Sequence, residues 1–523
     1  MNTKTFFFKL VLLSFYLFRI GKDRICADVN LPSIFSNNMV LQRNQINRIW
    51  GAAEVGEKIS VSIARQNHIT RANKDGNWQV EINPMPSSKV GYTLTVEGQN
   101  RIEIEDVLVG EVWLCSGQSN MEWPVSATYD SDIEKIISWN PYIRLISVPK
   151  LGTQEAQTDF EGEWNKATPK FVMDFSAVGF FFGRILHQSL DVPVGLIDNS
   201  WGGSAAEAWM SRNALEGIGA AEPYLEKWSG IEQNYDHDEV LSEFNIKLHE
   251  WEKTSKLARG NNQNSSGRPR KPRNPLVGQH RPSNLYNGVL KPIIGYGIRG
   301  VIWYQGESNT GRAKAYRDLF PSLIESWRHE WGQGHFPFYW VQLADFQEEN
   351  VRPENHGWAE LREAQTMTLD RLDNTGQAVT VNIGEGRDIH PRNKLTVAKR
   401  LARWALANDY GFSIDYQSPR FQRMEVQRNK LLLTFNHVGQ GLYSFDTREP
   451  RGFSICGEDG VFVWAQAKIV DKSQVLVWAK SVLSPTHVRY AWAANPVCNI
   501  MSRSGLPLTP FRTDDFPMLT LGR

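Results

Sequence analysis

The chain has 523 residues, of which 41% are hydrophobic, 11% aromatic and 22% charged, so we expect a globular protein rather than a disordered or fibrous one. At about 100 to 200 residues per domain, this length predicts two to four domains and excludes a single small binding module. The formal net charge of +1 argues against nucleic acid or an anionic membrane as the main partner. Function is therefore expected to reside in a defined site.

The first 27 residues have the pattern of a secretory signal peptide. Lys4 and Lys9 precede an apolar stretch at 10–17, and Ala27 offers a small residue for cleavage. Charged residues at 19–24 lengthen the gap before that site, so an uncleaved anchor is the alternative. No later segment approaches the ~18 uninterrupted apolar residues of a membrane helix. We expect a secreted or periplasmic product without a membrane span in the mature chain.

Cysteine usage gives no sign of a metal site. No cysteine lies in a CxxC pair or in a Cys/His cluster with zinc spacing. Cys115 adjoins the end of an expected strand and is expected to lie in the core. Cys456 and Cys498 either pair in an oxidising compartment or remain buried thiols.

The hydrophobic pattern divides the chain into a central α/β part with a β-domain on each side. Short alternating runs predict a β-sandwich at 28–106. Buried strands then alternate with helices over 107–415, which predicts an open, mainly parallel sheet covered on both faces, interrupted by an insertion at about 216–281. Strand character returns in a C-terminal β-domain, 416–523. The expected strands are 59–63, 78–82, 92–96, 107–114, 194–197, 301–304, 338–343, 378–383, 430–435 and 474–478, and the expected helices are 175–189, 235–258, 293–299 and 316–329.

A serine follows the nearly continuous apolar run 107–114. Ser119 lies in the segment SGQSNM, where a turn between strand and helix would expose its hydroxyl and direct backbone N–H groups to the same point. We predict that Ser119 is a nucleophile. The GxSxG elbow of α/β-hydrolases is absent, and an isolated Ser-Asn would more often cap a helix.

Two further segments follow buried strands, at 198–204 and 304–309. Three strand ends would then converge on the carboxyl edge of one sheet, where open α/β folds bind ligands. Gly202 or Gly203 allows close backbone approach and an N–H for an oxyanion, and the amide of Gln305 or Asn309 is a second candidate donor.

A fourth segment, GEGRDIHPRNK at 384–394, contains a histidine late in the chain. His390 is the natural general base because its pKa lies near neutrality, and Asp388 is placed to orient its ring.

The tryptophans beside the active segments suit a sugar ring, and Arg362 could meet a carboxylate, although a helix-surface ion pair would explain it equally well. The substrate-binding candidates are Asn120, Trp123, Trp201, Glu307, Asn309 and Arg362.

These segments resemble the four blocks of the SGNH (GDSL-like) hydrolases and, in detail, the sialate O-acetylesterase family. The resemblance spans nearly the whole mature chain. Its motifs are LCSGQSNMEWP at 114–124, WGGSAAEAWMS at 201–211, LYNGVLKP at 285–292, IWYQGESN at 302–309, DIHPRNK at 388–394 and FRTDDFP at 511–517.

The resemblance implies a flavodoxin-like, three-layer SGNH core with flanking β-domains that hydrolyses acetyl esters on a sugar without a metal or organic cofactor. It implies Ser119 as nucleophile, His390 as base, and the Ser119 N–H, Gly203 and Gln305 as oxyanion donors. The wider SGNH pattern separates acid and base by two residues, whereas Asp388 and His390 are separated by one, so Glu385 and Glu307 stay open as alternative orienting acids.

The leading hypothesis is a secreted carbohydrate O-acetylesterase acting on O-acetylated sialic acids. An esterase for acetylxylan or another plant glycan is the alternative within the enzyme class. From a different class, a non-catalytic glycan-binding protein would leave Ser119 without a role, and the presence of Ser119, Asp388 and His390 together argues against it.

Overall fold

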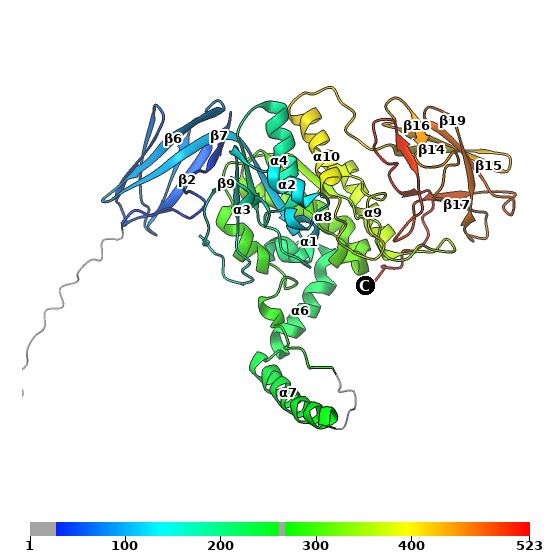
Figure 1. Ribbon diagram of the computed structural model, residues 1–523, viewed down its shortest axis with the longest axis horizontal. Helices are drawn as coiled ribbons and strands as arrows, with labels where there is room; N and C mark the ends of the chain where they lie inside the picture. Colours follow the sequence, from blue (N-terminus) through cyan, green and yellow to red (C-terminus); the bar gives the residue numbers. More distant parts are fainter. Residues whose placement is uncertain (1–27, 261–266, 523) are drawn as a thin grey trace, which may run out of the picture.

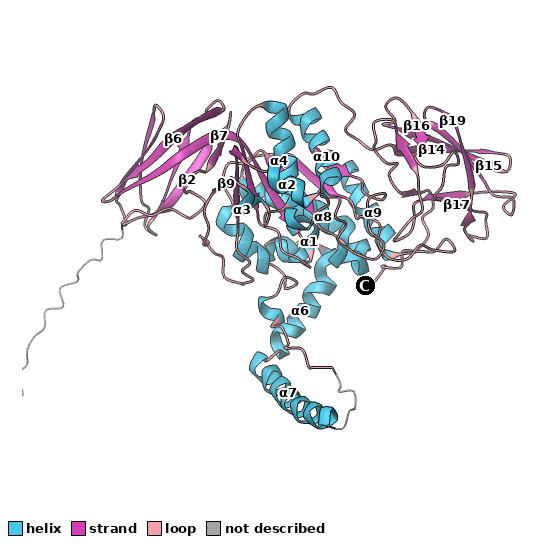
Figure 2. Ribbon diagram, in the orientation of Figure 1, coloured by secondary structure: helices cyan, strands magenta, loops and turns pink. Residues whose placement is uncertain are grey.

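The computed structural model describes residues 28–260 and 267–522, and the predicted signal peptide lies outside them. A central α/β part carries a β-domain on each side (Figure 1). Among the described residues, helices are confined to the central part and to the insertion below it, whereas the two flanking β-domains are built from strands and loops (Figure 2). Within the described residues, no helix is long and apolar enough to cross a membrane.

The central part is built on one mixed sheet. Its order is β13-β12-β11-β7-β10-β8-β9, and every neighbouring pair is parallel except β8 with β9. Counted along the chain from β7, the strands β10-β7-β11-β12-β13 follow the doubly wound order 2-1-3-4-5, with β8 and β9 added beyond β10. The strands are β7 (Arg101–Gly117), β8 (Asn140–Ser147), β9 (Asn165–Ala167), β10 (Val194–Asp198), β11 (Gly300–Tyr304), β12 (Phe338–Val341) and β13 (Thr375–Ala378).

Helices cover both faces of this sheet because its strands are apolar on both sides. Along β7, Trp113 and Cys115 pack in one buried cluster with α4 (Ala177–Leu190) and α10 (Lys394–Trp404). The residue between them, Leu114, packs in the opposite cluster with α8 (Ala313–Trp331) and α9 (Gly357–Met367). This alternation follows from the two-residue period of a strand. The predicted α/β class is therefore confirmed.

The N-terminal β-domain is joined to the core through a shared strand. The first half of β7 pairs antiparallel with β6 inside the β-domain, and its second half, from Glu111 on, is a central strand of the core sheet. The boundary expected between residues 106 and 107 therefore lies inside a continuous strand. Expected strands 59–63, 78–82 and 92–96 lie within β3, β5 and β6. The domain's other strands are β1 (Val40–Gln42), β2 (Asn47–Ala52), β3 (Lys58–Ile63), β4 (Gln66–Arg71), β5 (Asn77–Ile82) and β6 (Ser88–Glu97).

The C-terminal β-domain has its own core of buried aliphatic and aromatic side chains, including Leu431, Val475 and Val477. Cys456 and Cys498 are separate thiols, and Cys115 is a buried thiol of the central core, as predicted. The strands are β14 (Arg420–Gln427), β15 (Lys430–Asn436), β16 (Leu442–Ser444), β17 (Phe453–Cys456), β18 (Val463–Trp464), β19 (Gln466–Asp471), β20 (Gln474–Trp478), β21 (His487–Tyr490), β22 (Ile500–Ser502) and β23 (Phe511–Arg512).

The insertion is helical. The expected helix 235–258 is present as α7 (His237–Gly260), which stands away from the core (Figure 1). The preceding α6 (Glu222–Asn234) is anchored by Tyr224 and Trp228, which pack against Ala205.

The structure corrects two expected elements. The helix expected at 293–299 is absent: a 3₁₀ turn, Lys291–Ile293, precedes Gly295, whose φ of +97° ends any helical path. The strand expected at 378–383 ends at Ala378, because β13 pairs with β12 only as far as that residue. Val379 and Val381 are buried without belonging to a strand. The apolar run at 378–383 thus predicted correctly that its residues are buried, but it predicted wrongly that they form a strand.

Arg362 joins the core to the C-terminal β-domain. It is fully buried, and its guanidinium donates to the carbonyl oxygens of Leu343 (2.8 Å) and Ala344 (2.7 Å) in the core. It also donates to those of Ala493 (2.6 Å) and Ala494 (2.9 Å) in the β-domain. The prediction that Arg362 binds a substrate carboxylate is therefore wrong, because backbone carbonyls already take up its donors away from solvent.

We expect Arg362→Met to destabilise the protein by roughly 3 kcal/mol or more, because four buried carbonyls lose their donor. The change should lower the urea midpoint of unfolding. Arg423→Met is the control, since Arg423 pairs with Glu425 on an exposed strand. An Arg362→Met protein of unchanged stability would contradict this role.

Candidate active site

Ser119 lies where the strand order of the central sheet reverses. It is the first residue of the short helix α1 (Ser119–Glu122), two residues after the end of β7. The turn between them requires glycine: Gly117 has φ +135°, and a Cβ there would lie 2.2 Å from the carbonyl oxygen of Tyr304 at the end of β11. The strand ends therefore place Ser119 at the carboxyl edge between β7 and β11, which is the usual ligand position in such sheets.

His390 reaches Ser119 from a loop far along the chain. Its Nε2 lies 2.9 Å from Ser119 Oγ, and its Nδ1 lies 3.3 Å from Asp388 Oδ1. The same carboxylate oxygen accepts the backbone N–H of His390 at 2.9 Å, which fixes Asp388 against the ring. Trp123 stacks on the imidazole with 4.9 Å between ring centroids and 14° between planes. The imidazole is thus oriented from two sides.

Burial sets the protonation of the histidine. The pKa of His390 lies below its usual value because desolvation disfavours the imidazolium, and the opposing attraction of Asp388 is smaller. The imidazole is consequently neutral near pH 7. This is the form that can accept a proton from Ser119.

The structure distinguishes the three carboxylates that the sequence left open. Glu385 forms an ion pair with Arg392 (2.9 Å) and accepts a hydrogen bond from the Tyr129 hydroxyl (3.1 Å); Arg392 lowers the pKa of this carboxyl. Glu307 accepts a hydrogen bond from the amide of Asn120 at 2.6 Å. Asp388 is the one of the three whose carboxylate has a described contact with the His390 ring.

Asn120 ties the serine loop to the histidine loop. Its amide donates to Glu307 Oε1 and to the carbonyl oxygen of Ile389 (3.0 Å), and its oxygen accepts from Lys394 Nζ. Lys394 is fully buried, and burial lowers its pKa to about 7. Because all polar positions of the Asn120 side chain are occupied, the prediction that it binds substrate is not supported. It is a positioning residue for its neighbours Ser119 and Ile389.

The glycine turn after β10 packs against Ser119. A Cβ on Gly202 would lie 3.3 Å from Ser119 Cβ, and the Gly202 N–H donates to Glu122 Oε2 at 2.5 Å. Gly203 has φ +72°, and no hydrogen bond from its N–H to any described residue is present. The N–H of Ser119, at the first position of α1, also has no acceptor within the helix. Two backbone N–H groups in adjoining turns thus have no acceptor among the described residues.

Gln305 and Asn309 lie beneath this turn rather than in it. The amide of Gln305 donates to the carbonyl oxygen of Ser204 (3.1 Å) and to Asn309 Oδ1 (2.7 Å). Asn309 in turn donates to Glu207 Oε2 at 2.9 Å, and both amides are fully buried. The structure thus contradicts Gln305 and Asn309 as side-chain donors to an oxyanion or substrate. They brace the turn that carries Gly203.

Two tryptophans border the site. Trp123 and Trp201 are half-buried, and the backbone N–H of Trp201 donates to the carbonyl oxygen of Gly117 at 3.0 Å. Glu307 has one oxygen on Asn120 and a second, Oε2, buried without a partner among the described residues. Lys394 and Glu207 were not among the residues expected at the site from the sequence. Both lie within the quoted motifs, which was the available signal, but a charged side chain is ordinarily expected at the surface.

Comparison with known proteins agrees with this geometry. A family model described as carbohydrate esterase, sialic acid-specific acetylesterase, matches residues 279–404. The sialate O-acetylesterase of Rattus norvegicus is 31% identical, with 92% of this chain and 93% of the rat protein covered. The human sialate O-acetylesterase is 29% identical, with 92% and 91% covered.

A solved structure extends the agreement to the fold. The crystal structure of a carbohydrate acetylesterase from Xanthomonas citri superimposes with a TM-score of 0.77 at 34% identity, covering 93% of this chain and 100% of that one. On the strength of these relatives over nearly its whole length, the chain belongs to the sialate O-acetylesterase family of carbohydrate esterases.

Proposed function

We propose that the central part is an SGNH hydrolase core in which Ser119, His390 and Asp388 form the catalytic triad of a carbohydrate O-acetylesterase. The observation that carries the proposal is the 2.9 Å contact between Ser119 Oγ and His390 Nε2 at the carboxyl edge of the sheet. The flavodoxin-like order 2-1-3-4-5 of β10-β7-β11-β12-β13 supports the core assignment.

The proposed reaction is acyl transfer through the serine. His390 Nε2 accepts the proton of Ser119 Oγ as that oxygen attacks the acetyl carbonyl, and the backbone N–H groups of Ser119 and Gly203 stabilise the oxyanion. His390 then gives the proton to the departing sugar oxygen, leaving an acetyl-serine. Water, deprotonated by His390, attacks this ester, the bond between the acyl carbon and Ser119 Oγ breaks as His390 returns the proton to that oxygen, and acetic acid leaves and ionises to acetate. Asp388 stabilises the His390 imidazolium that forms both when the acetyl-serine is made and when it is hydrolysed.

The proposed substrate is an O-acetylated sialic acid, on the basis of the names of the relatives. The half-buried rings of Trp123 and Trp201 offer apolar faces for a sugar or its acetyl group. Because Arg362 is enclosed, it does not supply the positive charge for the carboxylate of such a sugar. We also propose that residues 1–27 direct the protein to a secreted or periplasmic location.

Acetate release tests both chemistry and substrate. The wild-type protein should release acetate from 9-O-acetylated sialic acid faster than from acetylated xylan, and Ser119→Ala should lower the rate by at least about a thousandfold with an unchanged circular dichroism spectrum. Preference for xylan would retain the triad and overturn the substrate. Turnover by a pure Ser119→Ala preparation would overturn the triad.

Asp388 and Glu385 provide a matched pair of variants in one loop. We expect Asp388→Asn to lower kcat by about a hundredfold or more, because the imidazolium loses its charged partner and its ring is no longer held in the required tautomer. Glu385→Gln removes an ion pair at the surface and should change kcat only a few-fold. Measuring kcat at saturating substrate separates the two. A larger loss in Glu385→Gln than in Asp388→Asn would reassign the orienting acid.

The pH dependence follows from the lowered pKa of His390. Activity requires the neutral imidazole, so kcat/KM should have its maximal value at pH 7. On acidification kcat/KM should fall, and the pH at half of the maximal value should lie below about 6.5. Asp388 favours the imidazolium, so Asp388→Asn should move this midpoint to still lower pH in its residual activity. A pH–rate profile of both proteins gives the result. An acid limb centred above pH 7 would contradict the assignment of His390 as the base.

A further inference from the structure

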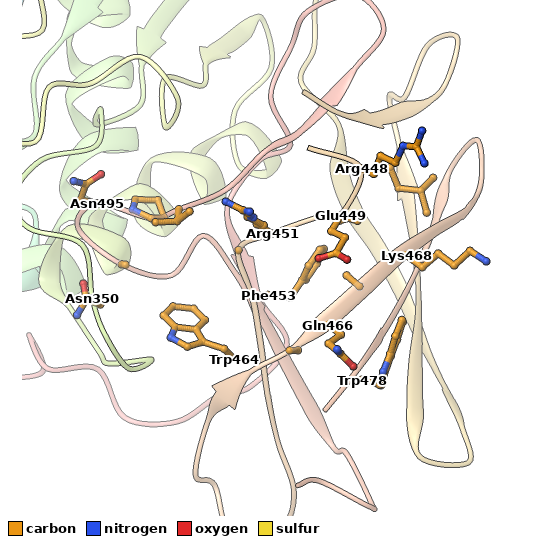
Figure 3. A pocket seen from close by; sticks show the side chains of 18 residues that line it. Asn350, Arg448, Glu449, Arg451, Phe453, Trp464, Gln466, Lys468, Trp478 and Asn495 are labelled. Carbon is orange, nitrogen blue, oxygen red and sulfur yellow. The ribbon is translucent and has the colours of Figure 1, made fainter. Parts of the chain in front are cut away.

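A cleft of about 680 Å³ lies on the C-terminal β-domain, apart from the residues of the active site. Its volume is in the range of small-molecule and cofactor sites. The residues that matter for the argument are Glu449, Arg451, Trp464, Gln466, Trp478 and Asn495. Figure 3 shows the indole rings of Trp464 and Trp478 on either side of Gln466, with Glu449 and Arg451 above them.

The two indole rings give this cleft its apolar surface. Trp464 is 45% exposed, unlike most large aromatic side chains of the protein, and its Nε1–H donates to the carbonyl oxygen of Val351 at 2.9 Å. That bond fixes the ring while its surface stays open to the cleft. Trp478 is half-buried on β20, directly opposite Gln466 of β19. The Lys430 ammonium lies over the Trp478 ring, 4.7 Å from its centroid, so it covers one face of that indole. The exposed ring of Trp464 and the uncovered surface of Trp478 suit the apolar face of a pyranose ring.

Uncommitted polar groups lie beside these rings. The side chains of Glu449, Arg451 and Gln466 form no hydrogen bond or ion pair with the part of the chain that the structure describes, and Arg451 attracts Asp446 only at longer range. A carboxylate, a guanidinium and an amide together donate to and accept from vicinal hydroxyl groups. Open indole rings combined with such groups are the recognition chemistry of a carbohydrate.

The wall of the cleft contacts the loop that carries the histidine. Asn495 donates to the carbonyl oxygen of Gln347 at 2.7 Å, and the Gln347 N–H donates to the carbonyl oxygen of Gly386 at 2.9 Å. A Cβ on Gly386 would lie 2.8 Å from Asn495 Nδ2, so the contact is direct. Gly386 precedes His390 by four residues, which limits their Cα separation to about 14 Å. These contacts connect the wall of the cleft with the loop that carries His390.

We propose that this cleft is an accessory binding site for the oligosaccharide chain that bears the acetyl ester, with Trp464 and Trp478 as stacking platforms. The proposal rests on the proposed esterase function, because it assigns to the cleft the remainder of the same substrate. The cleft adds affinity for extended glycans and leaves the chemistry at Ser119 unchanged.

Binding is measured first, in the Ser119→Ala protein, which does not consume the ligand. The probes are 9-O-acetylated sialyllactose, free 9-O-acetylated sialic acid and a neutral acetylated xylo-oligosaccharide. Trp464→Ala and Trp478→Ala should each weaken binding of the sialyllactose about tenfold and leave binding of the free sugar unchanged. Trp139→Ala is the control, because Trp139 is an exposed tryptophan outside the cleft. Equal loss for trisaccharide and free sugar, or none for either, would overturn the proposal.

Kinetics in the wild-type background provide the second readout. Gln466→Ala and Glu449→Ala are included because both side chains are exposed and removable without loss of a described contact. In all cleft variants KM for the trisaccharide should rise while kcat, and both constants for the free sugar, stay constant. A fall in kcat on both substrates would overturn the proposal.

The two proposals fail separately. Binding of an oligosaccharide that depends on Trp464 in a protein releasing no acetate would refute the esterase function and support the cleft as a carbohydrate site. Acetate release with binding insensitive to every cleft variant would refute the cleft alone. Tighter Trp464-dependent binding of the neutral xylo-oligosaccharide than of sialyllactose would retain the cleft as a carbohydrate site and change the glycan it selects.

Discussion

A single buried amide, that of Asn120, holds together the two loops on which the site depends. Ser119 and His390 are 271 residues apart in sequence, yet their side chains meet at 2.9 Å. Asn120 spans the gap by bonding to Ile389, which precedes the histidine, while Glu307 and Lys394 occupy its remaining positions. Enclosing a lysine and a glutamate costs desolvation energy, which raises the pKa of Glu307 and lowers that of Lys394. This desolvation energy is spent where the loop of Ser119 and the loop of His390 must keep a fixed relative position.

The surrounding architecture extends this constraint to the whole chain. β7 carries the serine turn at its end and belongs to the N-terminal β-domain at its beginning, so the serine is anchored to both. The histidine loop is supported from the other side, through Asn495 and Gln347 against Gly386. Arg362 bonds the core to the C-terminal β-domain, to which Asn495 also belongs. The flanking domains therefore act as walls of the catalytic part.

The sequence predicted what depends on local pattern. Continuous apolar runs identified β7, β10 and β11, and the motifs after them identified Ser119, His390 and Asp388, which the structure brings together. The sequence pattern gave wrong predictions where the role of a side chain depends on a partner that is distant in sequence. Gln305 could donate to an oxyanion or to the carbonyl of Ser204, and only the fold selects the second. Arg362 has the chemistry of a carboxylate ligand, but its burial among carbonyls is a tertiary property. The shared strand β7 was divided for the same reason, since a strand that changes sheets has no local signal.

The most direct test of the account is covalent labelling with a fluorophosphonate, which reacts with a serine only when a neighbouring base activates it. Intact-mass measurement followed by peptide mapping of the native protein should show one adduct per chain, on Ser119. The adduct should disappear in His390→Ala, while Asn120→Ala, which frees the histidine loop, should label far more slowly. An adduct on another serine, or labelling of Ser119 at the same rate without His390, would contradict the central claim that the Ser119–His390 contact constitutes the active site.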